Sequence, residues 1–131
     1  MSIQKSVLMM TNTSDQYTKT GDAIRADGWW GNTDGLHTVS VKVTNFKGCF
    51  RLEGTLSMAP TETDWFPIYL NPLSSTIPEI QYDYETSIRA FTFVGNFVFL
   101  RAKLVREEVF PPYEPSVVQT LGTIDKVLLA L

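Results

Sequence analysis

The chain has 131 residues, of which 44% are hydrophobic and 12% are aromatic, and its 11 basic and 14 acidic side chains give a formal net charge of −3. This length and composition predict one folded domain over residues 1–131 with a substantial core, and they exclude a disordered chain. The acidic balance, without any run of Lys or Arg, argues against nucleic acid as the main partner.

The first residues lack the basic-then-apolar pattern of a secretory signal, and no apolar stretch approaches the roughly 20 residues needed to cross a bilayer. We therefore expect no membrane partner. The single cysteine, Cys49, cannot form an intramolecular disulfide, and a half-buried structural role is the simplest interpretation for it. The fold should then depend on its core and on its partners.

The N-terminal part of the chain predicts short strands and loops. Residues 3–11 indicate a first strand, and residues 1–20 as a whole form either an N-terminal arm or an added strand. Residues 22–26 indicate a second short strand. The glycine-rich segment 28–35 predicts a loop.

The segment 36–58 carries the strongest pattern in the chain. Apolar and polar side chains alternate in two runs, which puts one face of each run on a core and the other in water or against a partner. The turn-forming residues 45–48 separate the runs, so the pattern predicts an antiparallel hairpin. The residues predicted to point inward are Val39, Val41, Val43, Phe50, Leu52, Leu56 and Met58.

The second half of the chain predicts further strands. Residues 65–70 contain Pro67 and indicate a short strand that is either at an edge or bulged, and residues 81–84 indicate a weak strand. Residues 87–94 and 97–105 read as a second hairpin, because the link Gly95–Asn96 suits a tight turn. Residues 124–131 indicate the last strand.

No window keeps a helical period, and turn signals recur every few residues. The fold class predicted from this pattern is all-β: an antiparallel β-sandwich, jelly-roll-like, with about eight or nine strands and little or no helix.

Residues that carry chemistry are few and do not form a recognisable constellation. His37 is the only histidine, and a hydrogen bond at a strand start explains it better than a catalytic triad. Three aspartates flank the glycine-rich loop, and three acidic residues near position 60 are close in sequence. Turn formation explains the three aspartates more simply than a calcium site does. The other three could supply a glycosidase-like pair of carboxylates, but the sequence does not indicate the cleft that such a pair needs. These residues are Asp22, Asp27, Asp34, Glu53, Glu62 and Asp64. We expect a non-enzymatic protein with no catalytic residues, no cofactor and no metal.

Aromatic residues in predicted loops are the better candidates for function. Such residues anchor protein interfaces or stack on sugar rings, and they can also simply cover the open ends of a sandwich. The interface candidates are Trp29, Trp30, Trp65, Phe110 and Tyr113. A glycan-binding module that uses the exposed tryptophans stays open as an alternative.

Five segments together carry a family resemblance. The segments are 34–43, 46–56, 63–65, 93–103 and 124–129. Their shared theme is a valine-rich strand, a glycine, a strand ending in Leu-Glu-Gly, then an Asp-Trp pair, and then a strand with Leu-Arg-Ala. This layout, over residues 20–131, resembles small β-sandwich structural proteins of tailed-bacteriophage particles, especially those of T4-like cyanophages.

The resemblance implies a structural role in the virion. The favoured role is that of a capsid decoration (cement) protein, because the chain is one small domain. The alternative role is that of a tail or baseplate component. The implied partners are the major capsid protein or tail subunits, with further copies of this chain in a homo-oligomer or symmetric array. The family brings no catalytic residues.

Overall fold

The computed structural model describes residues 6–11, 18–31, 35–70, 79–105 and 122–130. These residues form eight strands, one four-residue helix and one 3-10 turn. In chain order the elements are β1 (Ser6–Thr11), β2 (Thr18–Thr20), β3 (Ile24–Arg25), α1 (Asp27–Trp30), β4 (Leu36–Thr55), η1 (Glu62–Asp64), β5 (Phe66–Ile68), β6 (Ile80–Val94), β7 (Phe99–Val105) and β8 (Thr123–Ala130).

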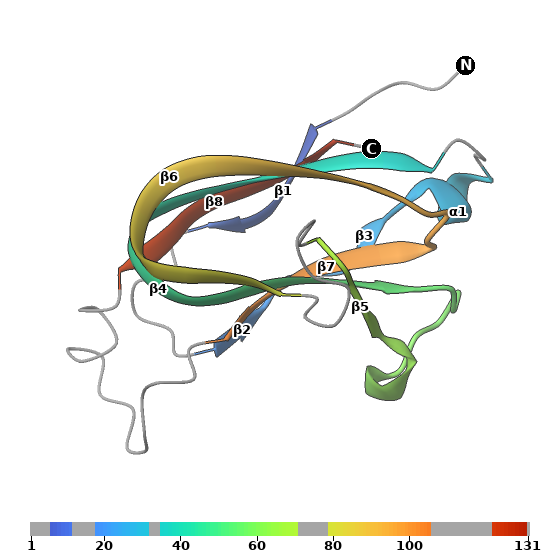
Figure 1. Cartoon of the computed structure of the whole chain (residues 1–131). Coiled ribbons are helices and arrows are strands. Elements are labelled where there is room, and N and C mark those ends of the chain that lie inside the picture. The colour runs from blue at the N-terminus through green and yellow to red at the C-terminus, as the bar shows by residue number, and fades with distance from the viewer. Residues whose placement is uncertain (1–5, 12–17, 32–34, 71–78, 106–121, 131) are drawn as a thin grey trace.

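All described strands belong to one antiparallel sheet, which curls into two facing layers (Figure 1). The first layer contains β1, β8, the first half of β4 and the second half of β6. The second layer contains the second half of β4, the first half of β6, and β5, β7, β2 and β3. The predicted antiparallel β-sandwich with little helix is therefore confirmed.

The prediction of a hairpin over 36–58 is wrong, because β4 is one continuous strand that bends from one layer into the other. Asn45 and Gly48 do have positive φ, at 47° and 149°. However, β6 stays paired with β4 on both sides of the bend, with register shifts between Val43 and Gly48. These bulges bend the two strands together, as Figure 1 shows, and no reversal of β4 onto itself occurs.

The second predicted hairpin is also wrong. β6 and β7 do not pair with each other; both pair with β4, where Val94 lies opposite Leu36 and Phe99 lies opposite Thr55. Residues 95–98 thus cross between the layers at the open end of the bent sheet. Backbone hydrogen bonds from Gly95 to Gly35 and from Val98 to Thr55, each 2.9 Å, hold this crossover.

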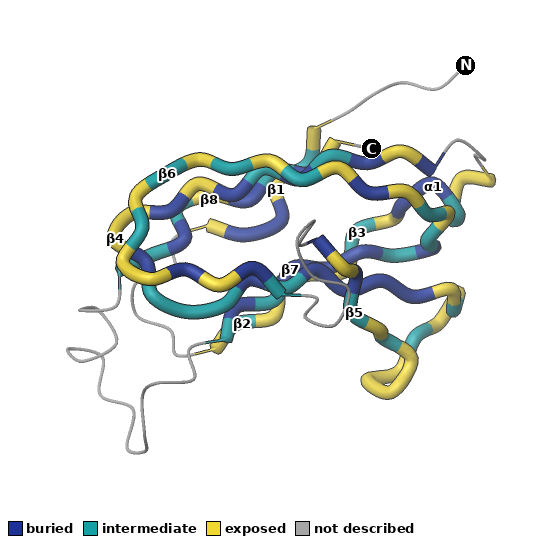
Figure 2. The backbone as a smooth tube through the Cα atoms, in the orientation of Figure 1, coloured by how far each residue is buried: buried dark blue, intermediate teal, exposed yellow. Residues whose placement is uncertain are grey.

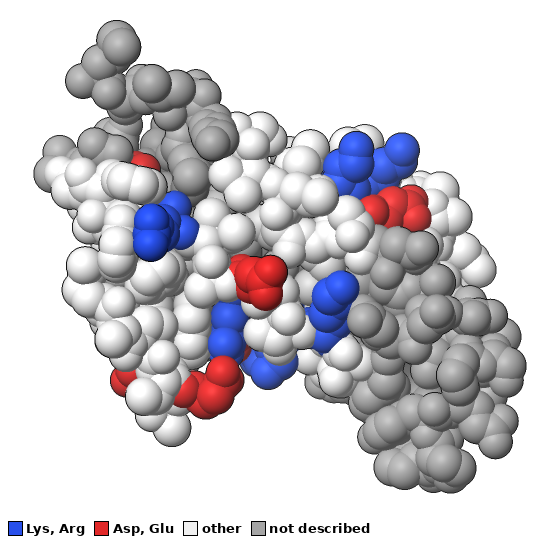
Figure 3. Space-filling view, turned by 180° about the vertical axis from the view of Figure 1, so that it is seen from behind, with Lys and Arg blue, Asp and Glu red and all other residues white. Residues whose placement is uncertain are grey.

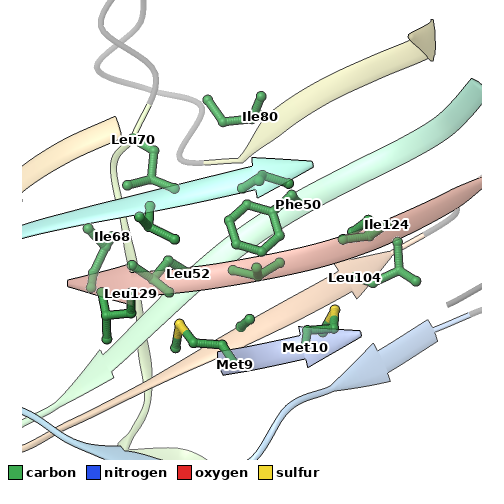
Figure 4. Packing of buried hydrophobic residues seen from close by; sticks show 14 of the residues in the cluster. Met9, Met10, Phe50, Leu52, Ile68, Leu70, Ile80, Leu104, Ile124 and Leu129 are labelled. Atoms are coloured by element: carbon green, nitrogen blue, oxygen red, sulfur yellow. The ribbon is translucent and has the colours of Figure 1, made fainter. Parts of the chain in front are cut away.

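The core lies between the two layers and follows the alternation of the strands (Figure 2). Val39, Val41 and Val43 are buried, as predicted, and so are Phe50 and Leu52. In Figure 4 the Phe50 side chain lies among residues of both layers, and each such side chain contributes about 1.5–3 kcal/mol when fully buried. The core cluster contains the residues labelled in Figure 4, which are Met9, Met10, Phe50, Leu52, Ile68, Leu70, Ile80, Leu104, Ile124 and Leu129.

The short elements at the edges of the sheet differ in how well the sequence predicts them. β5, with Pro67, pairs only with β4 among the described strands, so the predicted edge position is confirmed. Leu56 and Met58 were predicted to face the core, but β4 ends at Thr55 and both side chains are exposed. β1 pairs with β8 at the edge of the first layer. The predicted loop 28–35 contains most of α1, which ends at Gly31 in the left-handed conformation.

Candidate functional site

The outer face of the second layer is built around a buried ion pair. Glu53 of β4 lies opposite Arg101 of β7, and the Arg101 Nε donates to Glu53 Oε1 at 2.8 Å. The other two guanidinium nitrogens contact Glu62 at 3.3 and 3.4 Å. The ring centre of Trp65 lies 4.2 Å from the Arg101 Cζ. Arg101 therefore holds the segment with η1 and Trp65 against the sheet. This segment covers part of the outer face of the second layer.

Trp29 takes part in a second stack on the same layer. The Arg25 guanidinium carbon lies 4.5 Å from its ring centre, and the Phe99 ring centre lies 5.3 Å away. Arg25 and Phe99 are themselves opposite each other in the β3–β7 pair. Trp29 and Trp65 are both half-buried, so they act first as packing residues of the second layer.

The remaining predicted interface residues differ in their surroundings. Trp30, at the end of α1, is exposed, so its side chain is accessible for contact with another molecule. Phe110 and Tyr113 lie outside the described residues. Of the three described candidates, Trp29 and Trp65 stack on different arginines and Trp30 is exposed.

His37 has a structural position, as predicted. It is buried near the crossover, its Nε2 lies 3.2 Å from the Gly95 carbonyl oxygen, and its ring packs 5.2 Å from that of Phe93. Glu53 and Glu62 both contact Arg101 and so belong to the ion-pair network. Over the described ranges, no group of three or more His, Cys, Asp or Glu side chains could hold a metal ion, and no helix is long and apolar enough to cross a membrane.

The outer face of the first layer contrasts with that of the second, and we call it the open face. It combines the outward side chains of four adjacent strands, which pair in register. Successive rows across the strands are Leu36 and Val94; Ser6, Ala130, Thr38 and Thr92; Leu8, Leu128, Ser40 and Ala90; and Thr11, Lys126, Lys42 and Ile88.

The open face is largely uncharged and exposed. Four of its apolar side chains are unusually accessible: Leu8 is 51% exposed, Leu36 56%, Ile88 69% and Val94 73%. Between them lie small polar residues, such as Thr38 and Thr92, whose hydroxyl oxygens are 3.1 Å apart. Leu36 and Val94 are register partners, and Leu8 lies beside the half-buried Leu128. Because exposed apolar side chains gathered on one sheet face favour contact with another surface, the open face is the candidate interaction surface.

Sequence reasoning identified only part of this surface. The alternation in 36–44 already placed Thr38, Ser40 and Lys42 on the outer side of a strand. It could not place β8 and β6 beside them, since the pairing joins residues far apart in sequence.

The view from behind in Figure 3 shows charges of both signs in small groups, separated by uncharged surface.

The fold also makes a titration prediction. Burial raises the pKa of Tyr82 to about 12, and the charge of Arg89 acts less strongly in the opposite direction. The unfolded chain, with the ordinary tyrosine pKa of about 10, loses this proton first. The stabilisation by neutral Tyr82 is therefore complete below pH 10 and is lost as the pH rises through 12.

Ultraviolet absorbance of tyrosinate in the folded protein should show a late ionisation near pH 12 that belongs to Tyr82. Tyr82→Phe should remove that step, whereas Tyr84→Phe, at an exposed position, should leave it in place. A late step that persists in Tyr82→Phe would assign it to another tyrosine.

Comparison with known proteins adds no relative. No protein-family model matches the chain, and a search of curated proteins finds no match.

Proposed function

We propose that this protein is a non-enzymatic structural component of a tailed-bacteriophage virion, in the first place a capsid decoration protein that binds neighbouring subunits. The observation that carries the proposal is the open face. A role in the tail or baseplate would use the same surface, and is the alternative position. The sequence resemblance to small β-sandwich proteins of phage particles suggests the particle; the open face supplies the means of attachment.

The size of the open face suits repeated, individually weak contacts. Four strands about 4.8 Å apart, each contributing about seven residues at 3.3 Å, cover roughly 400 Å². Counted on both partners, such a contact buries about 800 Å², which is less than the roughly 1,000 Å² expected of a specific interface and fits a weak contact. In a particle with many copies, attachment through several linked contacts would nevertheless be durable.

Mass spectrometry of purified particles of the phage that encodes this chain tests the proposal. We expect the chain in many copies per particle, retained through repeated sedimentation. Its absence from the particles, or its loss in the first wash, would refute a structural role.

A matched pair of substitutions tests the surface. Val94→Asp introduces a charge into the open face, and we expect at least a tenfold loss of attached copies, because a desolvated charge costs more than about 1.4 kcal/mol. Leu56→Asp, at a similarly exposed apolar residue beyond the end of β4, should change occupancy less than about twofold. Equal effects of the two would exclude the open face as the attachment surface.

A further inference from the structure

Two lysines lie directly opposite each other on the open face. Lys42 of β4 and Lys126 of β8 are register partners, and both side chains are exposed. Like charges directly opposite each other in an antiparallel pair destabilise the sheet. Among the described residues, the ion pairs involve Lys47, Arg51, Arg89 and Arg101, and neither Lys42 nor Lys126. The lysine pair therefore lacks compensation within the described fold.

The second layer contains a similar arrangement that is compensated. Arg51 of β4 lies opposite Lys103 of β7, and the Arg51 guanidinium is 3.4 Å from a carboxylate oxygen of Glu53. On the open face, the nearby carboxylate of Asp125 instead accepts a hydrogen bond of 2.6 Å from the Thr44 hydroxyl. The chain as a whole is acidic, with a net charge of −3, so a basic pair on the open face is a local departure.

We infer that the open face docks on a different virion protein that presents carboxylates opposite Lys42 and Lys126. The apolar residues and the two ammonium groups then form one surface, on which partner carboxylates relieve the repulsion between the lysines. Self-association is a poorer fit. Two-fold packing centred on the open face about an axis along the strands would place Lys42 against Lys126, and an axis across the strands would place Lys42 against Leu36. This inference rests on the proposed function, because the partner belongs to the same particle.

Carbodiimide cross-linking of purified virions tests the chemistry directly, since it joins an ammonium to a carboxylate in contact with it. We expect cross-links from Lys42 or Lys126 to Asp or Glu of another virion protein. Cross-links from these lysines to another copy of this chain would overturn the choice of partner. Cross-links confined to Lys47 or Lys103 would overturn the choice of surface.

Charge reversal separates a docking role from an incidental one. Lys42→Glu and Lys126→Glu each create an opposite-charge pair, so each should raise the Tm of the isolated protein by about 1–4 °C. In virions, both variants should dissociate at several-fold lower salt concentration than the wild type. Lys103→Glu makes the same change in net charge on the other layer and should leave the salt dependence unchanged.

A higher Tm with unchanged attachment in Lys42→Glu and Lys126→Glu would refute the inference and leave the proposed function intact. Absence of the wild-type chain from virions would instead refute the proposed function, and the inference with it. The two failures are therefore distinguishable.

Discussion

Gly122→Ala should destabilise the protein by about 2–5 kcal/mol, a large effect for a single methyl group. Gly122 has φ of +73°, and an added Cβ would lie 1.9 Å from the Asn45 carbonyl oxygen and 2.5 Å from that of Thr44. These backbone atoms form the bend of β4, so they cannot move without disturbing the pairing of β4 with β6 and β8. The backbone conformation costs about 1–2 kcal/mol and the overpacking about 1–3 kcal/mol.

Gly31→Ala is the matched control for this substitution. Gly31 has nearly the same φ, +74°, but its added Cβ would meet no heavy atom within 4 Å. It should therefore cost only the backbone contribution of about 1–2 kcal/mol. Urea denaturation of the two variants measures the difference, which we expect to equal the overpacking contribution of about 1–3 kcal/mol. Equal losses would show that the segment before β8 does not pack against the bend.

Local patterns predicted most of the strands but not how they connect. The alternation around Val41 predicts an inward and an outward face whatever the partner strand is. The turn-forming character of Asn45 and Gly48 is also real, since both residues have positive φ. Whether such residues close a hairpin or bend a strand depends on pairing with β6, and the β6 residues opposite the bend lie about 40 positions after Asn45 in the sequence. Nothing in the sequence around Asn45 carries that information.

The link Gly95–Asn96 was misinterpreted for a related reason. Two residues between two apolar runs are typical of a hairpin, but neither residue here has positive φ. The crossover is instead held by distant partners: Gly28 donates to the Phe97 carbonyl oxygen at 2.8 Å, and His37 contacts Gly95. These contacts join segments that are separate in sequence, so local rules cannot favour them over a turn.

The candidate surface was predictable only in part. Residue type suggested that Trp29 and Trp65 contact other molecules, but each of them stacks on a guanidinium group supplied by another segment of the chain. Conversely, Ile88 and Lys126 join the open face through the register of β6 and β8 with β4. Exposure of an aromatic side chain depends on what packs against it, and residue type alone does not determine that.

Arg101→Ala should cost about 3 kcal/mol in the free energy of unfolding. The Arg101 and Glu53 side chains are only 9% and 8% exposed, and removal of one charge leaves the other buried without its closest partner. The range for such losses is about 3–5 kcal/mol, and the value here should be at its lower end, because Arg51 remains 3.4 Å from Glu53. The segment with η1 and Trp65 should also become sensitive to limited proteolysis, because Arg101 binds Glu62 and Trp65 to the sheet.

Two further variants separate the buried charge from the lost contacts. Glu53→Leu combined with Arg101→Met removes both charges, and it should recover most of the lost stability, since a buried ion pair gains little over apolar residues of similar size. Arg89→Ala breaks an ion pair whose side chains are 41% and 36% exposed, and it should cost no more than about 1 kcal/mol. If the double variant were as unstable as Arg101→Ala, the loss would come from the contacts of Arg101 with Glu62 and Trp65. The stacked loop, and not the neutralisation of Glu53, would then be what stabilises the second layer.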